Sequence, residues 1–333
     1  IIECKTEVMG FNTDTCECCG HTKIHYNSCK NLNCPECGAV DKEVWIHKQE
    51  RFTLNVNYFH VVFTIPNELN VLCLIDPKFM YKALFDVSAE TIKELSKDKK
   101  YLGAKIGFTS VLHTWGQNLS LHPHIHMIVP GGGIDSNGKW KNSKKKFFLP
   151  VKVVSKLFKG KFLSYTKKNF DQRKIKDEEQ FQNIINTCYS KDWVVYTKKP
   201  MKSAKHVVKY LGRYTHRIAI SNARIKKYED NKVTFSYKDY SDHNQIKEMT
   251  LDDTEFFRRY MMHVLPPNFM KIRHYGFLGN RNKEERIKAV RTATNTKNPG
   301  PLLIDYEQII SDILKRDVSI CIKCGQKRHY QLE

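Results

Sequence analysis

The alternation of apolar and polar residues along the chain predicts a protein with both helices and strands. Three segments predict strands: 58–65, which is rich in β-branched and aromatic residues, 106–115 and 122–130. Between the first two, apolar residues recur at helical spacing across 77–98. Three consecutive glycines at 131–133 follow the third strand and permit a sharp turn there.

The pattern in the second half of the chain is less regular. Residues 135–200 are rich in lysine and predict a basic, mostly helical insertion. Helices are then expected at 203–214 and 252–263, with strands within 217–250 between them. Residues 280–300 are basic and poor in apolar side chains, which predicts a linker or a DNA-bound arm.

The charge of the chain narrows the class of partner. Its 333 residues include 56 Lys and Arg against 35 Asp and Glu, a formal net charge of +21. Such an excess favours a polyanion, because binding to phosphates releases counterions, although a merely soluble basic protein is the alternative. A membrane partner is not expected, since the sequence has no run of 18 apolar residues and no signal-peptide pattern.

The cysteines are clustered and odd in number: seven of the eleven fall within the first 37 residues. This distribution favours metal binding in a reducing cytoplasm over a secreted disulfide framework. Two CxxC pairs stand there, 14 residues apart: Cys16 with Cys19, and Cys34 with Cys37. They predict one tetrahedral zinc that folds residues 1–45 rather than taking part in chemistry.

Other ligand sets for this zinc remain open. Cys18, Cys29 and His25 lie close enough in the sequence to replace a ligand or to bind a second ion. A further pair, Cys321 and Cys324, stands near the C-terminus. It is either half of a zinc site, completed by His329 or by other residues, or simply two thiols.

Three histidines alternate along the third predicted strand, at positions 122, 124 and 126. Alternate residues of a strand point to one face, so His124 and His126 project together, about 7 Å apart along the backbone. Two imidazoles at this spacing can bind one divalent ion. A third ligand is needed, and the first candidate is His206, with Gln117 and His113 in reserve.

A stripe of aromatic residues runs along the helix predicted at 203–214. Tyr210 and Tyr214 are one turn apart on it, and His206 lies one turn earlier. Core packing is the common explanation of such a stripe, but cations interrupt this one. They are Lys209, Arg213 and Arg217. A phenolate activated by a nearby metal and cations could attack a phosphodiester and form a phosphotyrosine bond.

These motifs together resemble the rolling-circle insertion-sequence transposases of the HUH superfamily, of the two-tyrosine type. The matching segments are Y-N-S-C-K-N-L-N-C-P-E-C (26–37), F-H-V-V-F-T-I-P (59–66), L-H-T-W-G-Q-N-L-S-L-H-P-H-I-H-M-I-V-P-G-G-G (112–133), Y-L-G-R-Y-T-H-R-I-A-I-S-N (210–222) and H-V-L-P-P-N-F-M-K-I-R-H-Y-G (263–276). They occur in the order typical of the family and extend over nearly the whole chain.

The resemblance implies an α+β fold: an HUH endonuclease core, with a mainly antiparallel central sheet and helices, plus a small N-terminal zinc-binding module. The expected regions are a zinc-binding domain at 1–48, the nuclease core at 49–225 and a C-terminal DNA-binding or accessory region at 226–333. The resemblance assigns the metal-binding pair to His124 and His126 and the nucleophiles to Tyr210 and Tyr214.

The resemblance further implies magnesium or manganese at the active site. The expected substrate is the single-stranded DNA of the element's ends, which is nicked and rejoined through a 5'-phosphotyrosine intermediate in a prokaryotic cytoplasm, at the nucleoid. A homo-oligomer is compatible with this activity. Two alternatives remain: a zinc-finger DNA-binding protein without catalysis, and a plasmid relaxase or replication initiator of the same superfamily.

Overall fold

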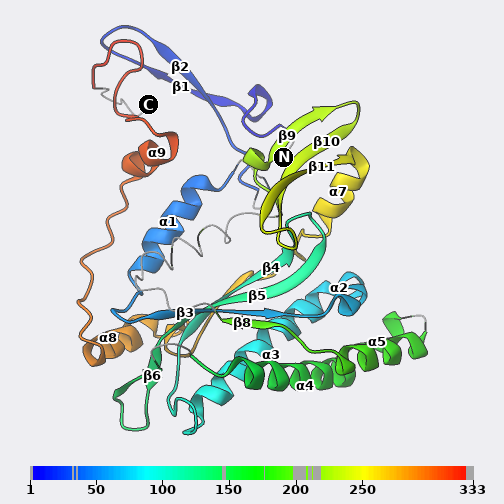
Figure 1. Ribbon diagram of the computed structural model, residues 1–333. Helices are drawn as coiled ribbons and strands as arrows, with labels where there is room; N and C mark the ends of the chain where they lie inside the picture. The colour runs from blue at the N-terminus through cyan, green and yellow to red at the C-terminus, as the bar shows by residue number, and fades with distance from the viewer. Residues whose placement is uncertain are drawn as a thin grey trace.

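A five-stranded antiparallel sheet forms the centre of the computed structural model, which describes residues 3–31, 34, 37–144, 148–175, 177–197, 208, 212 and 219–327 (Figure 1). From one edge to the other its strands are β12 (Ile272–Tyr275), β4 (Phe108–Trp115), β5 (Leu121–Pro130), β3 (Tyr58–Thr64) and β8 (Val195–Thr197). All four pairings are antiparallel. The three strands predicted from the sequence are therefore the three central ones, and the α+β fold class is confirmed.

Helices cover one face of this sheet and enclose the main hydrophobic core (Figure 1). They are α2 (Asn70–Ile75), α3 (Pro77–Lys97), α4 (Val151–Asn169) and α5 (Glu178–Ser190). The last two arise from the segment predicted as a basic helical insertion. Apolar residues at i, i+4 and i+8, namely Val154, Phe158 and Phe162, place one side of α4 in the core. The same segment ends in β8, which pairs with β3 at the edge of the sheet.

The opposite face of the sheet carries helix α1 (Ala39–Glu50). Tyr58, Val111 and Ile128 of the three central strands form a small apolar cluster there with Trp45 of α1. Because side chains alternate between faces along a strand, the positions two and four residues from these three point to the same side. This face therefore also carries the histidines of β3, β4 and β5.

A second, smaller sheet packs against the turn that joins β4 to β5. It consists of β9 (Ile225–Glu229), β10 (Lys232–Asp239) and β11 (Gln245–Asp252), and it is followed by helix α7 (Asp253–Met261). The side chain of Leu119, at the tip of the β4–β5 turn, is fully buried in the core of this smaller unit, beside Phe235 and Phe256.

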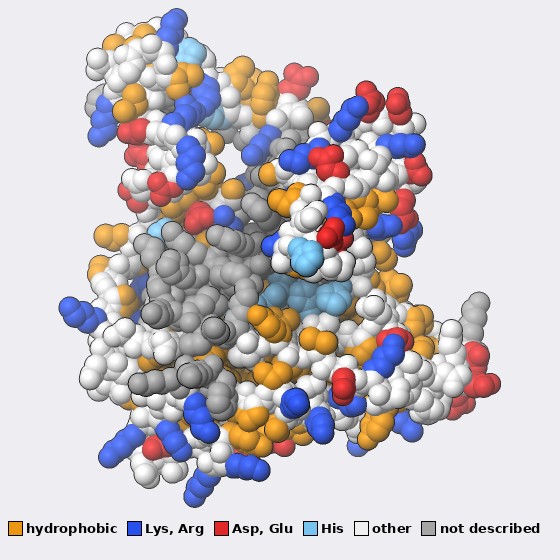
Figure 2. Space-filling model, viewed as in Figure 1, with side chains coloured by type: hydrophobic (Ala, Val, Ile, Leu, Met, Phe, Trp, Pro, Cys, Tyr) orange, Lys and Arg blue, Asp and Glu red, His pale blue; other side chains and the backbone are white. Residues whose placement is uncertain are grey.

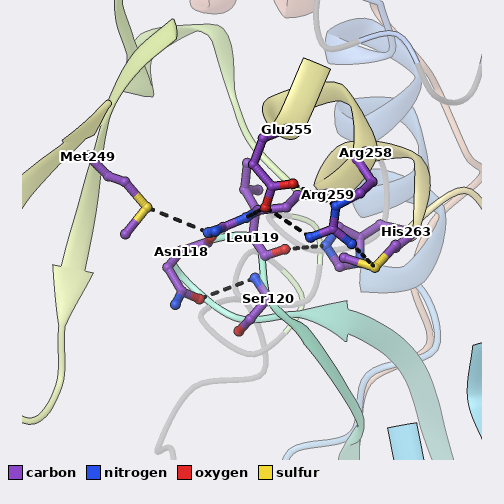
Figure 3. A network of polar contacts seen from close by, with 9 residues as sticks. Asn118, Leu119, Ser120, Met249, Glu255, Arg258, Arg259 and His263 are labelled. Atoms are coloured by element: carbon purple, nitrogen blue, oxygen red, sulfur yellow. Dashed lines mark hydrogen bonds and ion pairs between the residues drawn. The ribbon is translucent and has the colours of Figure 1, made fainter. Parts of the chain in front are cut away.

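Polar contacts fix the same turn to α7 and the residues after it (Figure 3). Arg259 donates a hydrogen bond to the carbonyl of Asn118 at 3.2 Å, and Glu255 holds the Arg259 guanidinium at 2.7 Å. His263 Nε2 donates to the Leu119 carbonyl at 3.1 Å, and its Nδ1 accepts from the Thr114 hydroxyl at 3.2 Å. The β4–β5 hairpin, which carries the histidines, is therefore held both at strand β4 and at its turn.

The segment predicted as a linker or arm at 280–300 instead contains helix α8 (Lys283–Ala293). The prediction was wrong because two apolar residues are enough to pack this helix on the rest of the protein. Ile287 and Val290, three positions apart, are buried against Leu54 and Phe277. A further helix, α9 (Tyr306–Leu314), follows and packs against α1.

Two short hairpins and five 3₁₀ turns complete the described elements. The hairpins are β1 (Phe11–Thr15) with β2 (Thr22–Tyr26), and β6 (Gly132–Ile134) with β7 (Trp140–Asn142). The 3₁₀ turns are η1 (Glu7–Met9), η2 (Asn67–Leu69), η3 (Gln172–Lys174), η4 (Asn222–Arg224) and η5 (Gly276–Leu278). In the part of the chain that the structure describes, no helix is both long enough and apolar enough to span a membrane.

Candidate functional site

Three histidines from the two central strands converge on one point of the α1-bearing face. His113 lies on β4, directly opposite His124 on β5, and His126 is two residues further along β5. One ligand nitrogen from each lies within 4.8 Å of the other two. Histidine side chains are visible near the centre of the face shown in Figure 2, below the small β9–β11 sheet. The antiparallel register thus adds a third imidazole to the pair that alternates along β5.

Hydrogen bonds behind the cluster orient two of these rings. His124 Nδ1 donates to the carbonyl of His122 at 2.6 Å, which leaves its Nε2 lone pair available. His126 Nδ1 lies 2.7 Å from Nε2 of His60 on β3, and the two rings stack with their centroids 5.0 Å apart. His60 is thus an outer partner of the cluster that sequence analysis did not single out. Its signal was a lone histidine within an otherwise apolar strand.

The protonation states suit metal binding. Burial lowers the pKa of His113 well below its usual 6.5, and the other histidines of the cluster lower it further. Burial also lowers the pKa of His124 to about 4. Both imidazoles are therefore neutral at pH 7 and can offer a lone pair to a cation.

An aromatic ring and a cation extend the site along β4. The Trp115 ring stacks on His113 with centroids 4.7 Å apart, and the Lys271 ammonium lies 4.9 Å from the Trp115 centroid. Lys271 precedes β12, and its carbonyl accepts a hydrogen bond from the Leu112 backbone at 3.0 Å. Burial lowers the pKa of Lys271 to about 7. The segment 263–276 was assigned no chemistry from the sequence, yet it supplies this cation.

The remaining residues predicted for the active site are not among those that the structure describes. They are His206, Tyr210, Tyr214, Lys209, Arg213 and Arg217. Two other positions of the predicted tyrosine helix are described, and both are helical and buried. Val208 lines a small cavity with Tyr58, Thr109 and Ile128, all on the histidine-bearing face. Gly212 lies against Ile46 of α1, where an added Cβ would come within 2.3 Å of Ile46 Cδ1.

Of the two reserve candidates for the third ligand, the structure brings His113 into the cluster. The amide of Gln117 instead lies 3.5 Å from the hydroxyl of Tyr240, beside the small sheet. The first candidate, His206, lies outside the described residues.

The structure does not bring the four cysteines predicted for one zinc together. It divides them between two groups. One is Cys4, Cys29, Cys34 and Cys37, and the other is Cys16, Cys19, Cys321 and Cys324. The reason is the β1–β2 hairpin, whose strands of five residues each span about 17 Å. Cys16 and Cys19 occupy its turn, whereas Cys4 and Cys29 flank its base, so the two CxxC pairs predicted to share an ion are held apart.

The structure also places the other candidate zinc ligands. Cys29 belongs to the first group, with its Sγ 3.5 Å from that of Cys37. Cys18 is exposed and belongs to neither group, and His25 lies on β2 with its Nε2 3.7 Å from Asp14. The pair at 321 and 324 faces two more thiols instead of standing alone, and His329 lies outside the described residues.

The chain matches both protein-family models and individual curated proteins. Residues 107–286 match a family model described as "Putative transposase", and residues 1–65 match one described as "Transposase zinc-binding domain". The second match and the cysteine groups together support structural zinc in this chain. No solved structure matches the chain significantly.

Two curated relatives align with nearly all of the chain. "Putative transposase y4qJ" of Sinorhizobium fredii is 38% identical over 99% of this chain and 86% of its own length. "Transposase for insertion sequence element IS801" of Pseudomonas savastanoi pv. phaseolicola is 29% identical over 99% of this chain and 81% of its own length. The chain therefore belongs to the family of rolling-circle insertion-sequence transposases that carry an N-terminal transposase zinc-binding domain.

Proposed function

We propose that this transposase nicks and rejoins single-stranded DNA at the ends of its element through a 5'-phosphotyrosine intermediate. One observation carries the proposal: three imidazoles on the central strands, His113, His124 and His126, offer ligand nitrogens within 4.8 Å of one another. Structural zinc in proteins is usually bound by four protein ligands, whereas catalytic ions keep positions open for substrate. A set of three imidazoles fits the second kind of site.

The donor set suits a divalent ion. The imidazoles at positions 113 and 124 are neutral at pH 7, and those at 124 and 126 have hydrogen-bond partners behind them. Magnesium prefers oxygen ligands, so of magnesium and manganese we favour manganese for this site. When bound, such an ion polarises a nonbridging phosphate oxygen and orients the scissile phosphate.

Tyr210 and Tyr214 are the proposed nucleophiles. The phenol oxygen of one tyrosine attacks phosphorus and loses its proton, and the P–O3' bond breaks, so that the freed 3' oxygen gains a proton. One phosphoester replaces another, and a 3'-hydroxyl can therefore reverse the step and rejoin the strand. The position of Val208 and Gly212, on the histidine-bearing face and against α1, supports placing the tyrosine helix beside the cluster.

Cations would hold the DNA backbone during both steps. From the predicted helix we propose Lys209, Arg213 and Arg217 as DNA contacts, and His206 as an additional ligand or phosphate contact. Lys271 joins them, because its ammonium lies beside the Trp115–His113 stack. The net charge of +21 favours such a polyanionic substrate. A cytoplasmic, nucleoid-associated site of action and a homo-oligomeric state are also proposals.

The test uses labelled single-stranded DNA from an element end, with and without Mn²⁺. Wild-type protein should yield a nicked strand and a DNA–protein adduct on a denaturing gel only when the ion is present. His113→Ala, His124→Ala and His126→Ala should each abolish both products while the protein still binds DNA. His122→Ala is the matched control, because it leaves the His122 carbonyl that orients His124 in place.

Three results would overturn the proposal. They are full-rate nicking by the His124→Ala variant, nicking that is independent of any divalent ion, and DNA binding by the wild-type protein with no adduct under any condition. The last result would favour a zinc-finger DNA-binding protein without catalysis.

A further inference from the structure

Two turns of the same construction lie at opposite ends of the chain. Each has the sequence C-x-x-C-G, once at 16–20 and once at 321–325. In both, the glycine has a positive φ, +66° at Gly20 and +71° at Gly325, and its N–H donates to the carbonyl of the first cysteine. In both, the N–H of the first cysteine donates to the carbonyl five residues later, at His21 or Gln326.

The strand pairing around the two turns also agrees. Thr15 pairs with Thr22 across the first turn, and Ile320 pairs with Lys327 across the second. Each pair joins the residue before the first cysteine to the residue six positions after that cysteine. Two turns 305 residues apart in the numbering therefore present their cysteines in the same way, the first on the β1–β2 hairpin and the second on a one-bridge hairpin closed by Ile320 and Lys327.

The thiols of the two hairpins face one another. Cys16 Sγ lies 3.7 Å from Cys324 Sγ, and Cys19 Sγ lies 3.8 Å from Cys321 Sγ. Four sulfurs at ~2.3 Å from a central zinc, at the corners of a tetrahedron, are ~3.8 Å apart. A disulfide would require ~2.05 Å, so the spacing matches shared coordination and not a covalent bond.

Apolar packing offers little to hold these hairpins together. Their large apolar side chains are mostly exposed: Phe11 by 54%, Ile24 by 50%, Ile320 by 39% and Ile322 by 59%. Cys16 and Cys321, in contrast, are almost fully buried, at 4% and 1% exposure. Burial centred on the thiols, with apolar groups at the periphery, is typical of a domain that folds around a metal ion.

We propose that Cys16, Cys19, Cys321 and Cys324 bind a second structural zinc, which joins the two ends of the transposase chain in one zinc ribbon. The first zinc then belongs to Cys4, Cys29, Cys34 and Cys37, at the base of the β1–β2 hairpin. The zinc-binding module is consequently not confined to the N-terminal region: the last described turn of the chain supplies half of its second site. Helix α9, which packs on α1, leads the chain back to this point (Figure 1).

The test measures zinc per chain in the purified full-length protein by plasma emission spectrometry. Wild-type protein should hold two zinc ions. Cys321→Ser/Cys324→Ser and Cys16→Ser/Cys19→Ser should each hold one. The variant that combines all four substitutions should also hold one, because both pairs serve the same ion. Cys18→Ser is the matched control, since Cys18 lies within the first turn but outside the cluster, and it should keep two.

The combined variant separates a shared site from two independent ones. If each pair bound its own ion with unknown partners, the four substitutions together would remove two zinc ions instead of one. That result, or two zinc ions retained by Cys321→Ser/Cys324→Ser, would overturn the proposal. The ion that remains in each variant, at Cys4, Cys29, Cys34 and Cys37, also reports that the rest of the zinc-binding module has folded.

Discussion

Replacing His60 by phenylalanine should weaken metal binding at the histidine cluster without removing a ligand. His60 Nε2 lies 2.7 Å from His126 Nδ1, and both side chains are buried, at 2% and 8% exposure. Phenylalanine keeps an aromatic ring, somewhat larger, where the imidazole stacks on His126 with an interplanar angle of 8°, and it has no ring nitrogens. The change therefore removes the hydrogen bond while an aromatic ring still fills the site.

The expected loss of metal affinity can be estimated in two ways. Loss of the outer partner of a metal-bound imidazole costs about 10- to 100-fold in metal affinity or activity, or about 1.4–2.7 kcal/mol. Leaving the buried His126 Nδ1 without this partner costs about 1–3 kcal/mol. The two estimates agree, so we expect the Mn²⁺ concentration for half-maximal nicking to rise about 10- to 100-fold, by the first of them.

The assay is a Mn²⁺ titration of single-turnover nicking, paired with calorimetric titration of Mn²⁺ alone. His60→Gln should recover part of the affinity, because its amide can still form a hydrogen bond in the same direction. His122→Ala should titrate as the wild type does. If His60→Phe binds Mn²⁺ with wild-type affinity and nicks at the wild-type rate at every concentration, the proposed orienting role is refuted.

Three more predictions concern other parts of the molecule. Burial lowers the pKa of His263 to about 4, so the folded state favours the neutral ring; its contribution to stability is complete above pH 6.5 and is lost as the pH falls toward 4. Between pH 7 and pH 5 the free energy of unfolding, measured with urea, should fall by about 2 kcal/mol more for the wild type than for His263→Gln. Equal decreases would contradict this. Gly276→Ala should destabilise the fold by at least about 2 kcal/mol in the same assay, since the residue has φ +59° and the new Cβ would lie 1.8 Å from the Ile106 carbonyl oxygen; an unchanged unfolding midpoint would speak against it. At pH 6, where the ammonium form of Lys271 prevails because its pKa is about 7, Lys271→Met should slow single-turnover nicking about tenfold with the Mn²⁺ dependence unchanged, because it removes one charge-assisted phosphate contact; a shift in the Mn²⁺ dependence alone would show that the residue acts on the cluster instead.

The central strands could be predicted because their sequences admit one interpretation. The run that became β3 is β-branched and aromatic and is followed by proline, and the run that became β5 is followed by three glycines; both lie in the middle of the sheet. Helix α8 was missed because Ile287 and Val290 are its only buried apolar residues and most of its other side chains are charged or polar. With only two apolar contacts, the sequence of this helix shows no clear 3.6-residue periodicity of apolar positions.

The candidate metal sites show that the spacing of residues in the sequence predicts only ligands that are neighbours on one element. His124 and His126 are separated by one residue of one strand, so a single rule of strand geometry relates them. His113 and His60 reach them through the register of neighbouring strands, which the sequence alone does not specify. The cysteines are a stronger example: a CxxC pair does not reveal which other pair completes its site, and in this structure the partner of Cys16 lies 308 residues away.

The most direct test of the proposed chemistry is to identify the residue that carries the DNA. The adduct formed by wild-type protein with single-stranded element-end DNA and Mn²⁺ would be digested with nuclease and protease and sequenced by mass spectrometry. We predict a 5'-phosphonucleotide on Tyr210 or Tyr214, with Tyr210 the principal site, and no adduct from the Tyr210→Phe/Tyr214→Phe double variant. An adduct on any other residue, or one that persists in the double variant, would contradict the tyrosine mechanism.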